Sequence, residues 1–223
     1  MAEALSHDRM SARIRLLIVN PNTSVSVTRW LAEEAKRVAG GRAEIAAVNA
    51  PSGLSAIQTP DDLLQAAKVI VGTIEADAAA DVAIIAAFGD PGLTEARARL
   101  AIPVMGLGEA GLRAAASRRF SIVTLGEEMR AALVERVRSL GLEDRLAEIR
   151  ILPVSIPEMI ANREANLGAL VDAIRACAED AVLLGGAPLA GLGVKMAKET
   201  GLTVLDGVEA SVTAALQISG RGS

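Results

Sequence analysis

Several loops in this sequence place amide, hydroxyl and small residues directly after short apolar runs. The first is Asn20-Pro21-Asn22-Thr23-Ser24, which offers two amides, two hydroxyls and the start of a helix. Backbone N–H groups in the first turn of a helix favour a carboxylate or another anionic acceptor. An ordinary turn, in which Thr23 or Ser24 caps the helix, explains the same residues. The loop is a candidate substrate-binding segment, with capping as the alternative.

Two acidic residues follow later strands and are candidates for proton transfer. Asp90 lies in the segment 88–92, Phe-Gly-Asp-Pro-Gly, and Glu109 follows the segment 105–108, Met-Gly-Leu-Gly. A carboxylate at a cleft, with a shifted pKa, can act as a general acid or base. Asp-Pro-Gly is also common turn chemistry, and either carboxylate could cap a helix or pair with an arginine. We predict catalytic roles for Asp90 and Glu109, with these structural roles as alternatives.

The remaining polar and small candidates follow two further strands. Thr124 ends one strand, and Gly185-Gly186-Ala187-Pro188 follows another. Glycine allows a backbone to approach a ligand closely, although a glycine loop alone is a weak signal. We expect Thr124 and this loop to contact the substrate.

The elements that must position these residues are short Val/Ile/Leu runs alternating with longer helical patterns. This alternation predicts βαβ units and parallel strands, whose ligands bind at the carboxyl ends of the strands. The expected strands are residues 15–19, 44–48, 82–86, 104–106, 120–124, 148–153, 181–184 and 203–206. The expected helices are residues 25–39, 61–79, 93–100, 108–117, 128–140, 166–179, 192–200 and 208–218.

A weak internal sequence repeat indicates two similar halves. Residues 81–93 and 180–192 each contain an acidic residue, an apolar strand, small residues with a proline, and the start of a helix. No linker rich in Pro, Gly or Ser separates the halves. We therefore predict an α/β fold with two closely packed, pseudo-symmetric lobes, each a Rossmann-like parallel sheet, and an active-site cleft between them.

Composition limits the chemistry further. The net charge is −4, so a nucleic-acid partner is not expected, and no apolar stretch is long enough to span a membrane. The chain has one histidine, His7, and one cysteine, Cys177, which argues against a disulfide, a Cys/His metal site and a Ser-His-Asp triad. We read Cys177 as a buried structural thiol on a helix. No dinucleotide or phosphate-loop motif is present, so no cofactor is expected, and the expected location is the cytoplasm.

At these loops the chain resembles the hydantoin racemase branch of the aspartate/glutamate racemase superfamily. The resemblance rests on segments 20–24, 86–93, 106–110, 120–124 and 206–208, which occur in the order of that family. It implies two lobes, with residues 12–102 and 203–218 in the first and residues 103–202 in the second. It also implies a small-molecule substrate and a homo-oligomer.

The resemblance fails at the two residues that perform racemisation in this family. Its racemases use one cysteine from each lobe, on opposite faces of the substrate carbon. The position of the first cysteine, before Phe88, is Ala87 here, and the position of the second is Gly186. Ala87, Phe88 and Gly186 are therefore expected in the substrate site, but without an exchangeable proton at Ala87 or Gly186.

Three functions remain open from the sequence. The favoured one is an isomerase-like, cofactor-independent enzyme that acts on a small hydantoin-like or amino-acid-derived carboxylate by non-cysteine chemistry. A decarboxylase, or a hydrolase that attacks a hydantoin-type ring carbon, is the first alternative. A non-catalytic protein that binds small molecules is the second.

Overall fold

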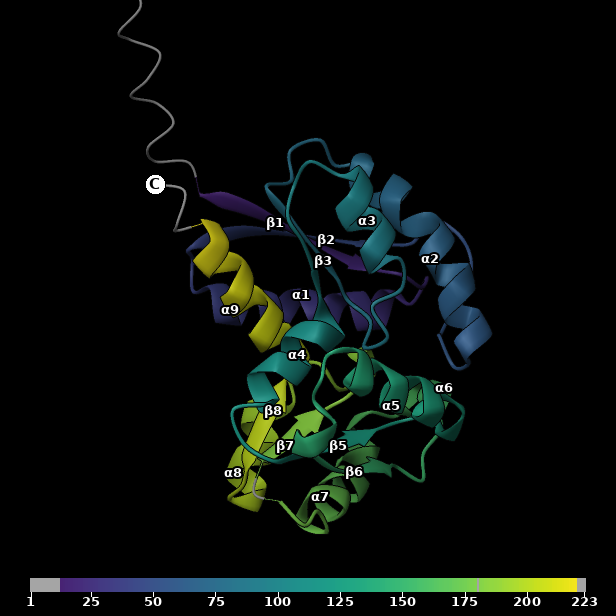
Figure 1. Ribbon diagram of the computed structural model, residues 1–223, viewed down its shortest axis with the longest axis vertical. Coiled ribbons are helices and arrows are strands. Elements are labelled where there is room, and N and C mark those ends of the chain that lie inside the picture. The colour runs from purple at the N-terminus through teal and green to yellow at the C-terminus, as the bar shows by residue number, and fades with distance from the viewer. Residues whose placement is uncertain (1–12, 180, 220–223) are drawn as a thin grey trace, which may run out of the picture.

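The strands form two separate four-stranded sheets with the same internal order. The computed structural model describes residues 13–179 and 181–219, so His7 lies outside the described part of the chain. The strand order is β2-β1-β3-β4 in one sheet and β6-β5-β7-β8 in the other, and every pair is parallel. Figure 1 shows one sheet and its helices above the other. The predicted α/β fold with two pseudo-symmetric lobes is confirmed.

The elements of the first lobe alternate along the chain. Its strands are β1 (Ile14–Asn20), β2 (Ala43–Asn49), β3 (Val82–Ile85) and β4 (Val104–Gly106). Its helices are α1 (Val25–Ala39), α2 (Pro60–Glu75) and α3 (Leu93–Arg99). All four residues of β3 are buried, as expected for a strand with helices on both faces of its sheet.

The second lobe repeats this alternation with shorter helices. Its strands are β5 (Phe120–Thr124), β6 (Leu146–Ile151), β7 (Ala181–Leu184) and β8 (Thr203–Asp206). Its helices are α5 (Arg130–Ser139), α6 (Ile156–Ala161), α7 (Leu167–Arg175) and α8 (Gly193–Thr200). All eight predicted strands are present with small shifts at their ends. Helix α6 was not predicted, because six residues with a proline in the first turn give no periodic pattern.

Two helices cross between the lobes. Helix α4 (Leu107–Ala115) follows β4 of the first sheet and packs against β7 and β8 of the second. Helix α9 (Gly207–Ser219) follows β8 and packs against α1 and α4. The two helices meet closely: a Cβ atom on Gly207 would lie 2.6 Å from Leu107 Cδ2. In Figure 1, α4 lies between the sheets and α9 lies beside the first one.

This crossing corrects the lobe boundaries expected from the sequence. Residues 104–106 were assigned to the second lobe, but β4 pairs with β3 in the first sheet. Residues 203–206 were assigned to the first lobe, but β8 pairs with β7 in the second sheet. The chain passes from one lobe to the other at α4 and at α9, the helices that follow β4 and β8. Each lobe boundary therefore falls one strand later than predicted.

The hydrophobic core is continuous across the two lobes. One cluster of buried residues extends from Leu16 and Ile18 in the first sheet to Ile122 and Leu183 in the second. Such a contiguous core indicates two lobes packed as one unit rather than joined by a linker. No helix in the described part of the chain combines the length and the apolar character that a membrane span requires.

Candidate active site

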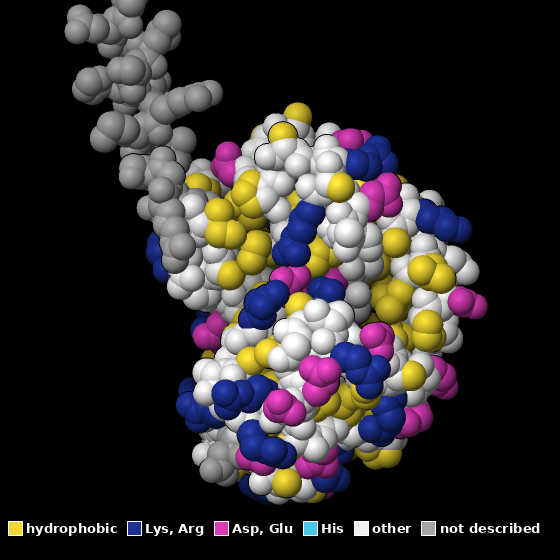
Figure 2. Space-filling view, viewed as in Figure 1, with side chains coloured by type: hydrophobic (Ala, Val, Ile, Leu, Met, Phe, Trp, Pro, Cys, Tyr) yellow, Lys and Arg dark blue, Asp and Glu magenta, His cyan; other side chains and the backbone are white. Residues whose placement is uncertain are grey.

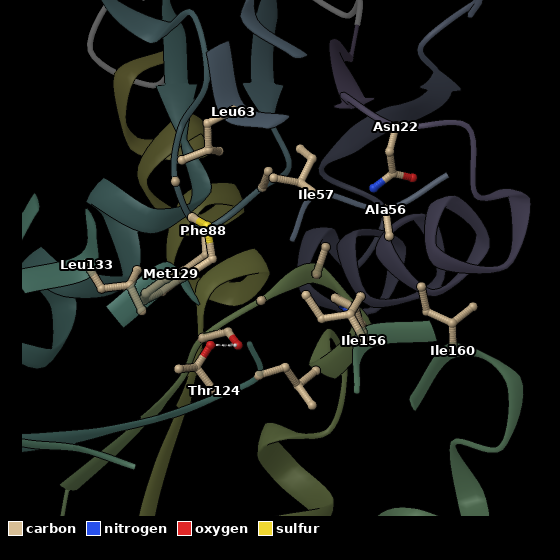
Figure 3. Close-up of a pocket in the computed structure, with 17 residues that line it drawn as sticks. Asn22, Ala56, Ile57, Leu63, Phe88, Thr124, Met129, Leu133, Ile156 and Ile160 are labelled. Atoms are coloured by element: carbon tan, nitrogen blue, oxygen red, sulfur yellow. Dashed lines mark hydrogen bonds between the residues drawn. The ribbon is translucent and has the colours of Figure 1, made fainter. Parts of the chain in front are cut away.

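A pocket of about 70 Å³ lies between the lobes at the carboxyl ends of their strands. Figure 3 shows its lining, to which both lobes contribute. Of the residues expected to bind substrate, the lining includes eight: Asn22, Ala87, Phe88, Thr124, Gly185, Gly186, Ala187 and Pro188. Loops that are far apart in the sequence thus meet in one place, as parallel-sheet topology predicts.

Asn22 supplies a fixed hydrogen-bond donor at one side of the pocket. Its side-chain oxygen accepts hydrogen bonds from Asn20 Nδ2 at 3.0 Å and from the Ser24 N–H at 2.9 Å. These two donors define which end of the amide is oxygen, so Nδ2 is the end left for a ligand. In Figure 3 the nitrogen of this amide is on the side of the pocket interior.

The other residues of the Asn20–Ser24 loop have structural roles, as the helix-capping alternative predicts. Asn20 is fully buried and also donates to Thr28 Oγ1 at 2.9 Å. Ser24 caps α1 by accepting a hydrogen bond from the Val27 N–H, and Thr23 bonds to the Leu54 carbonyl. Asn20, Thr23 and Ser24 are not among the residues that line the pocket. Asn20 and Ser24 hold the Asn22 side chain, whereas Thr23 holds the loop to Leu54.

The opposite lobe contributes a hydroxyl and two glycines. Thr124 Oγ1 donates to the Gly185 carbonyl at 2.8 Å, which fixes the β7 loop against the end of β5. A Cβ atom on Gly185 would lie 3.0 Å from the Thr124 side chain, so this contact requires a glycine or a local shift. Gly186 has a φ of +113°, a conformation that residues with a side chain rarely adopt.

The rest of the lining is an apolar wall that sequence reasoning missed. Its members come from the segment before α2, from the loops after β3 and β5, and from α2, α5 and α6. They are Ala56, Ile57, Leu63, Gly89, Leu125, Met129, Leu133, Ile156 and Ile160. The start of α2, which carries Leu63, is fixed by a capping box between Thr59 and Asp62. Both helix starts carry a readable signal, namely Thr59 with Asp62 for α2, and Ser155 with Glu158 and a proline in the first turn for α6.

None of the described residues that line this pocket can transfer a proton near neutral pH. The 17 lining residues include no carboxyl, imidazole, thiol, ammonium or guanidinium group. Ala87, in the loop after β3, is 8% exposed, and its methyl group carries no exchangeable proton. A general acid or base must reach its proton directly or through one water. The polar groups of the lining can therefore only donate or accept hydrogen bonds.

Asp90 does not line the pocket, contrary to expectation. Its carboxylate is 1% exposed and accepts hydrogen bonds from the Gly108 N–H at 2.8 Å and the Glu109 N–H at 2.7 Å, at the start of α4. Arg136 Nη2, on α5 of the second lobe, lies 2.6 Å from Asp90 Oδ2. Burial raises the pKa of Asp90 to about 6, although Arg136 opposes the shift. Asp90 thus holds the loop after β3 to the start of α4 and to α5.

Glu109 also lies outside the pocket and is surrounded by arginines. Its carboxylate bonds to Arg97 Nη1 at 2.9 Å and to Arg113 Nε at 3.0 Å, with Arg136 Nη2 at 3.5 Å. Burial raises the pKa of Glu109, but Arg113 and Arg97 outweigh it, and the pKa is lowered overall. A carboxylate held ionised by arginines is a poor proton donor, and its position gives no support to the expected catalytic role.

Cys177 does not line the pocket and cannot supply a thiol to it. It lies just after α7, rather than within the predicted helix, and packs half-buried against the second lobe's core. Burial and nearby Glu148 raise the pKa of its thiol, which lowers its reactivity. No group of three or more His, Cys, Asp or Glu residues in the described chain is arranged to hold a metal ion.

Comparison with known proteins identifies the class to which this fold and pocket belong. The family model for Asp/Glu/Hydantoin racemase matches residues 16–215. The chain therefore belongs to the Asp/Glu/hydantoin racemase family and is a racemase-like enzyme.

Individual members of the family are similar to this chain over most of its length. A hydantoin racemase of Pseudomonas sp. (strain NS671) is 31% identical over 207 residues, which cover 89% of this chain and 83% of the relative. The solved allantoin racemase of Klebsiella pneumoniae is 28% identical with a TM-score of 0.89, over 94% of this chain and 89% of that one. A solved mutant of arylmalonate decarboxylase shares the fold, with 18% identity and a TM-score of 0.67 over 94% of each chain.

Proposed function

We propose that this protein acts on a small hydantoin-like or amino-acid-derived carboxylate without thiol chemistry. Relatives named hydantoin racemase and allantoin racemase support a small ring substrate. The observation that carries the proposal is the pocket lining, which has hydrogen-bonding groups but no acid or base. Two-base racemisation needs one proton-transfer group on each face of the substrate carbon, and Ala87 and Gly186 supply none.

Decarboxylation is the reaction class that this lining supports best. The bond between the substrate carbon and its carboxylate breaks, CO₂ leaves, and the electron pair passes into the adjacent carbonyl as an enolate. Water then protonates the carbon, so no side chain has to remove a proton. An apolar wall that excludes water favours loss of a carboxylate over its retention as a buried charge. The same fold carries a decarboxylase in another protein.

Each side of the pocket has a distinct part in this reaction. The Asn22 amide would donate a hydrogen bond to an enolate oxygen, and the Thr124 hydroxyl would position the Gly185–Gly186 backbone beside the ring. Fixed donors aimed at a developing oxyanion are a large source of rate enhancement. Hydrolysis of the ring has less support, because no base in the lining would activate water.

A ligand-binding protein without turnover is the second candidate. It is favoured by the same lack of titratable groups, since binding requires only shape and hydrogen bonds. It predicts stabilisation of the fold by a ligand, with the ligand recovered unchanged.

The test is release of CO₂ from 5-alkylhydantoin-5-carboxylates, followed by proton NMR of the ring. Decarboxylation predicts enzyme-dependent conversion to the 5-alkylhydantoin, which Asn22→Leu would slow by about 10²-fold through loss of the oxyanion donor. Unchanged substrate that still raises the melting temperature would support the binding protein instead. Opening of the ring would contradict both.

A further inference from the structure

A second recess adjoins the pocket, next to its apolar wall. Leu63, Met129 and Leu133 line both spaces, and Arg136 lines only the recess, which measures about 300 Å³. In Figure 3 these three shared side chains lie together on the side away from Asn22. A ligand held in the pocket would therefore present a substituent on this side to the recess.

Arg136 brings unused hydrogen-bond donors to the recess. Its contacts with the described residues are made by Nη2, to Asp90 Oδ2 at 2.6 Å and to Glu109 Oε2 at 3.5 Å. Nε is buried without a partner among the described residues, and none of their contacts engages Nη1. The side chain is 26% exposed. An arginine normally meets carboxylates through two nitrogens, so this end-on contact leaves most of its donor capacity free.

The charges around Arg136 leave a positive excess. Within the described part of the chain, the ion pairs of this cluster join three guanidinium groups, those of Arg97, Arg113 and Arg136, to two carboxylates, those of Asp90 and Glu109. Figure 2 shows charged side chains of both signs where the two lobes meet. One further negative charge would balance this cluster.

The other acidic residue of the recess does not supply that charge. Glu135 lines the recess, but its carboxylate bonds to Arg138 at 2.7 Å on the exposed face of α5. The remaining lining, which includes Ala132 and Leu133, is mainly apolar. A partly buried cation in such surroundings attracts an anion more strongly than one in open solvent.

We propose that the recess is a subsite for a carboxylate on the ligand's side chain, with Arg136 as its binding residue. The proposal rests on the proposed function, because the ring occupies the same pocket. It names the substrate class as a hydantoin-type ring whose substituent ends in a carboxylate about one or two carbons from the ring. Arg136 binds this tail and takes no part in bond breaking.

The test compares hydantoin-5-acetate with hydantoin-5-acetamide, which differ only in the charge of the tail. Isothermal titration calorimetry at pH 7.5 should show that the full-length protein binds the acetate at least about tenfold more tightly, as expected for a charge-assisted hydrogen bond. Arg136→Gln should remove that preference. Arg99→Gln, which removes an exposed arginine outside both the recess and this charge cluster, should keep it.

Equal affinities for the two ligands in the unmodified protein would overturn the proposal, and this comparison needs no variant to fold. Retention of the preference in a folded Arg136→Gln protein would also overturn it. Failure of both tailed rings to bind, while 5-isopropylhydantoin binds, would reject the subsite and leave the proposed function intact. Failure of every ring would reject both.

Discussion

Placing cysteines at Ala87 and Gly186 tests whether these two positions face opposite sides of one ligand, as the sequence resemblance implies. Ala87 and Gly186 come from different lobes and line the same pocket. At Ala87 the backbone is ordinary, so a cysteine adds one sulfur atom to an existing Cβ. At Gly186 a new Cβ would lie 3.7 Å from Pro188 Cδ and 4.0 Å from Thr124 Oγ1, which is ordinary contact.

The two substitutions differ in their expected cost. Gly186→Cys forces a side chain onto a backbone with φ of +113°, which should lower the free energy of unfolding by about 1–3 kcal/mol. Ala87→Cys should change it by less than about 1 kcal/mol, because the sulfur enters open pocket space. Chemical denaturation of both single variants measures this difference directly.

The expected gain is in proton transfer. A positioned general base contributes about 10²–10⁴-fold to a rate, so Ala87→Cys should accelerate exchange of the α-proton of 5-isopropylhydantoin in D₂O by that factor. With Gly186→Cys added, the second face gains a proton donor, and chiral chromatography should then detect racemisation. Ala87→Ser, which has a similar size but a hydroxyl that stays protonated, is the matched control.

The geometric reasoning would be refuted by a folded double-cysteine variant that binds the hydantoin yet exchanges no α-proton. In that case the two positions would not flank the substrate carbon. Equal exchange in Ala87→Ser and Ala87→Cys would refute the role of the thiolate.

Three further predictions concern the structure around the pocket. Gly108→Ala should destabilise the fold by about 3 kcal/mol or more, because the new Cβ would lie 1.9 Å from the Phe88 carbonyl oxygen. Gly168→Ala is the control, because no atom lies within 4 Å of the new Cβ, and thermal unfolding of both variants measures the difference. Thr124→Val should cost about 1–3 kcal/mol by leaving the buried Gly185 carbonyl unpaired, again measured by denaturation. Burial raises the pKa of Asp206 from 3.8 to about 6, so the folded chain binds a proton that the unfolded chain releases, and stability should fall by about 3 kcal/mol as pH rises from about 4 to 6. Asp90, whose pKa burial also raises to about 6, adds a fall of its own in this range, so Asp206→Asn should remove the share of Asp206 and leave that of Asp90. An unchanged profile would contradict the assignment.

The fold could be predicted because each element carries its own local signal. Strand β3 is a four-residue buried run between turn residues, and α1 begins with a serine that caps it and ends with Gly40 in a left-handed conformation. The lobe boundaries could not be predicted, because strand pairing is a long-range property. Nothing local indicates that β4 joins β3 while the helix after it packs on the other lobe.

The sequence predicts those pocket-lining residues that come soon after a strand or at its end, such as Asn22, Thr124 and Gly186. The apolar wall of the pocket was missed, because residues such as Leu63 and Ile160 look like ordinary helix residues until tertiary packing turns them toward a ligand. Asp90 was assigned to catalysis because its sequence setting could not reveal two backbone donors and Arg136 around its carboxylate.

The most direct test of the central claim is α-proton exchange by the unmodified protein. Single enantiomers of 5-isopropylhydantoin would be incubated with it in D₂O and followed by proton NMR and chiral chromatography. A pocket without an acid or base predicts no exchange beyond the spontaneous rate and no change in enantiomeric purity. Saturable exchange that depends on the protein would contradict the claim, because it would require a proton-transfer group that the pocket lining does not contain.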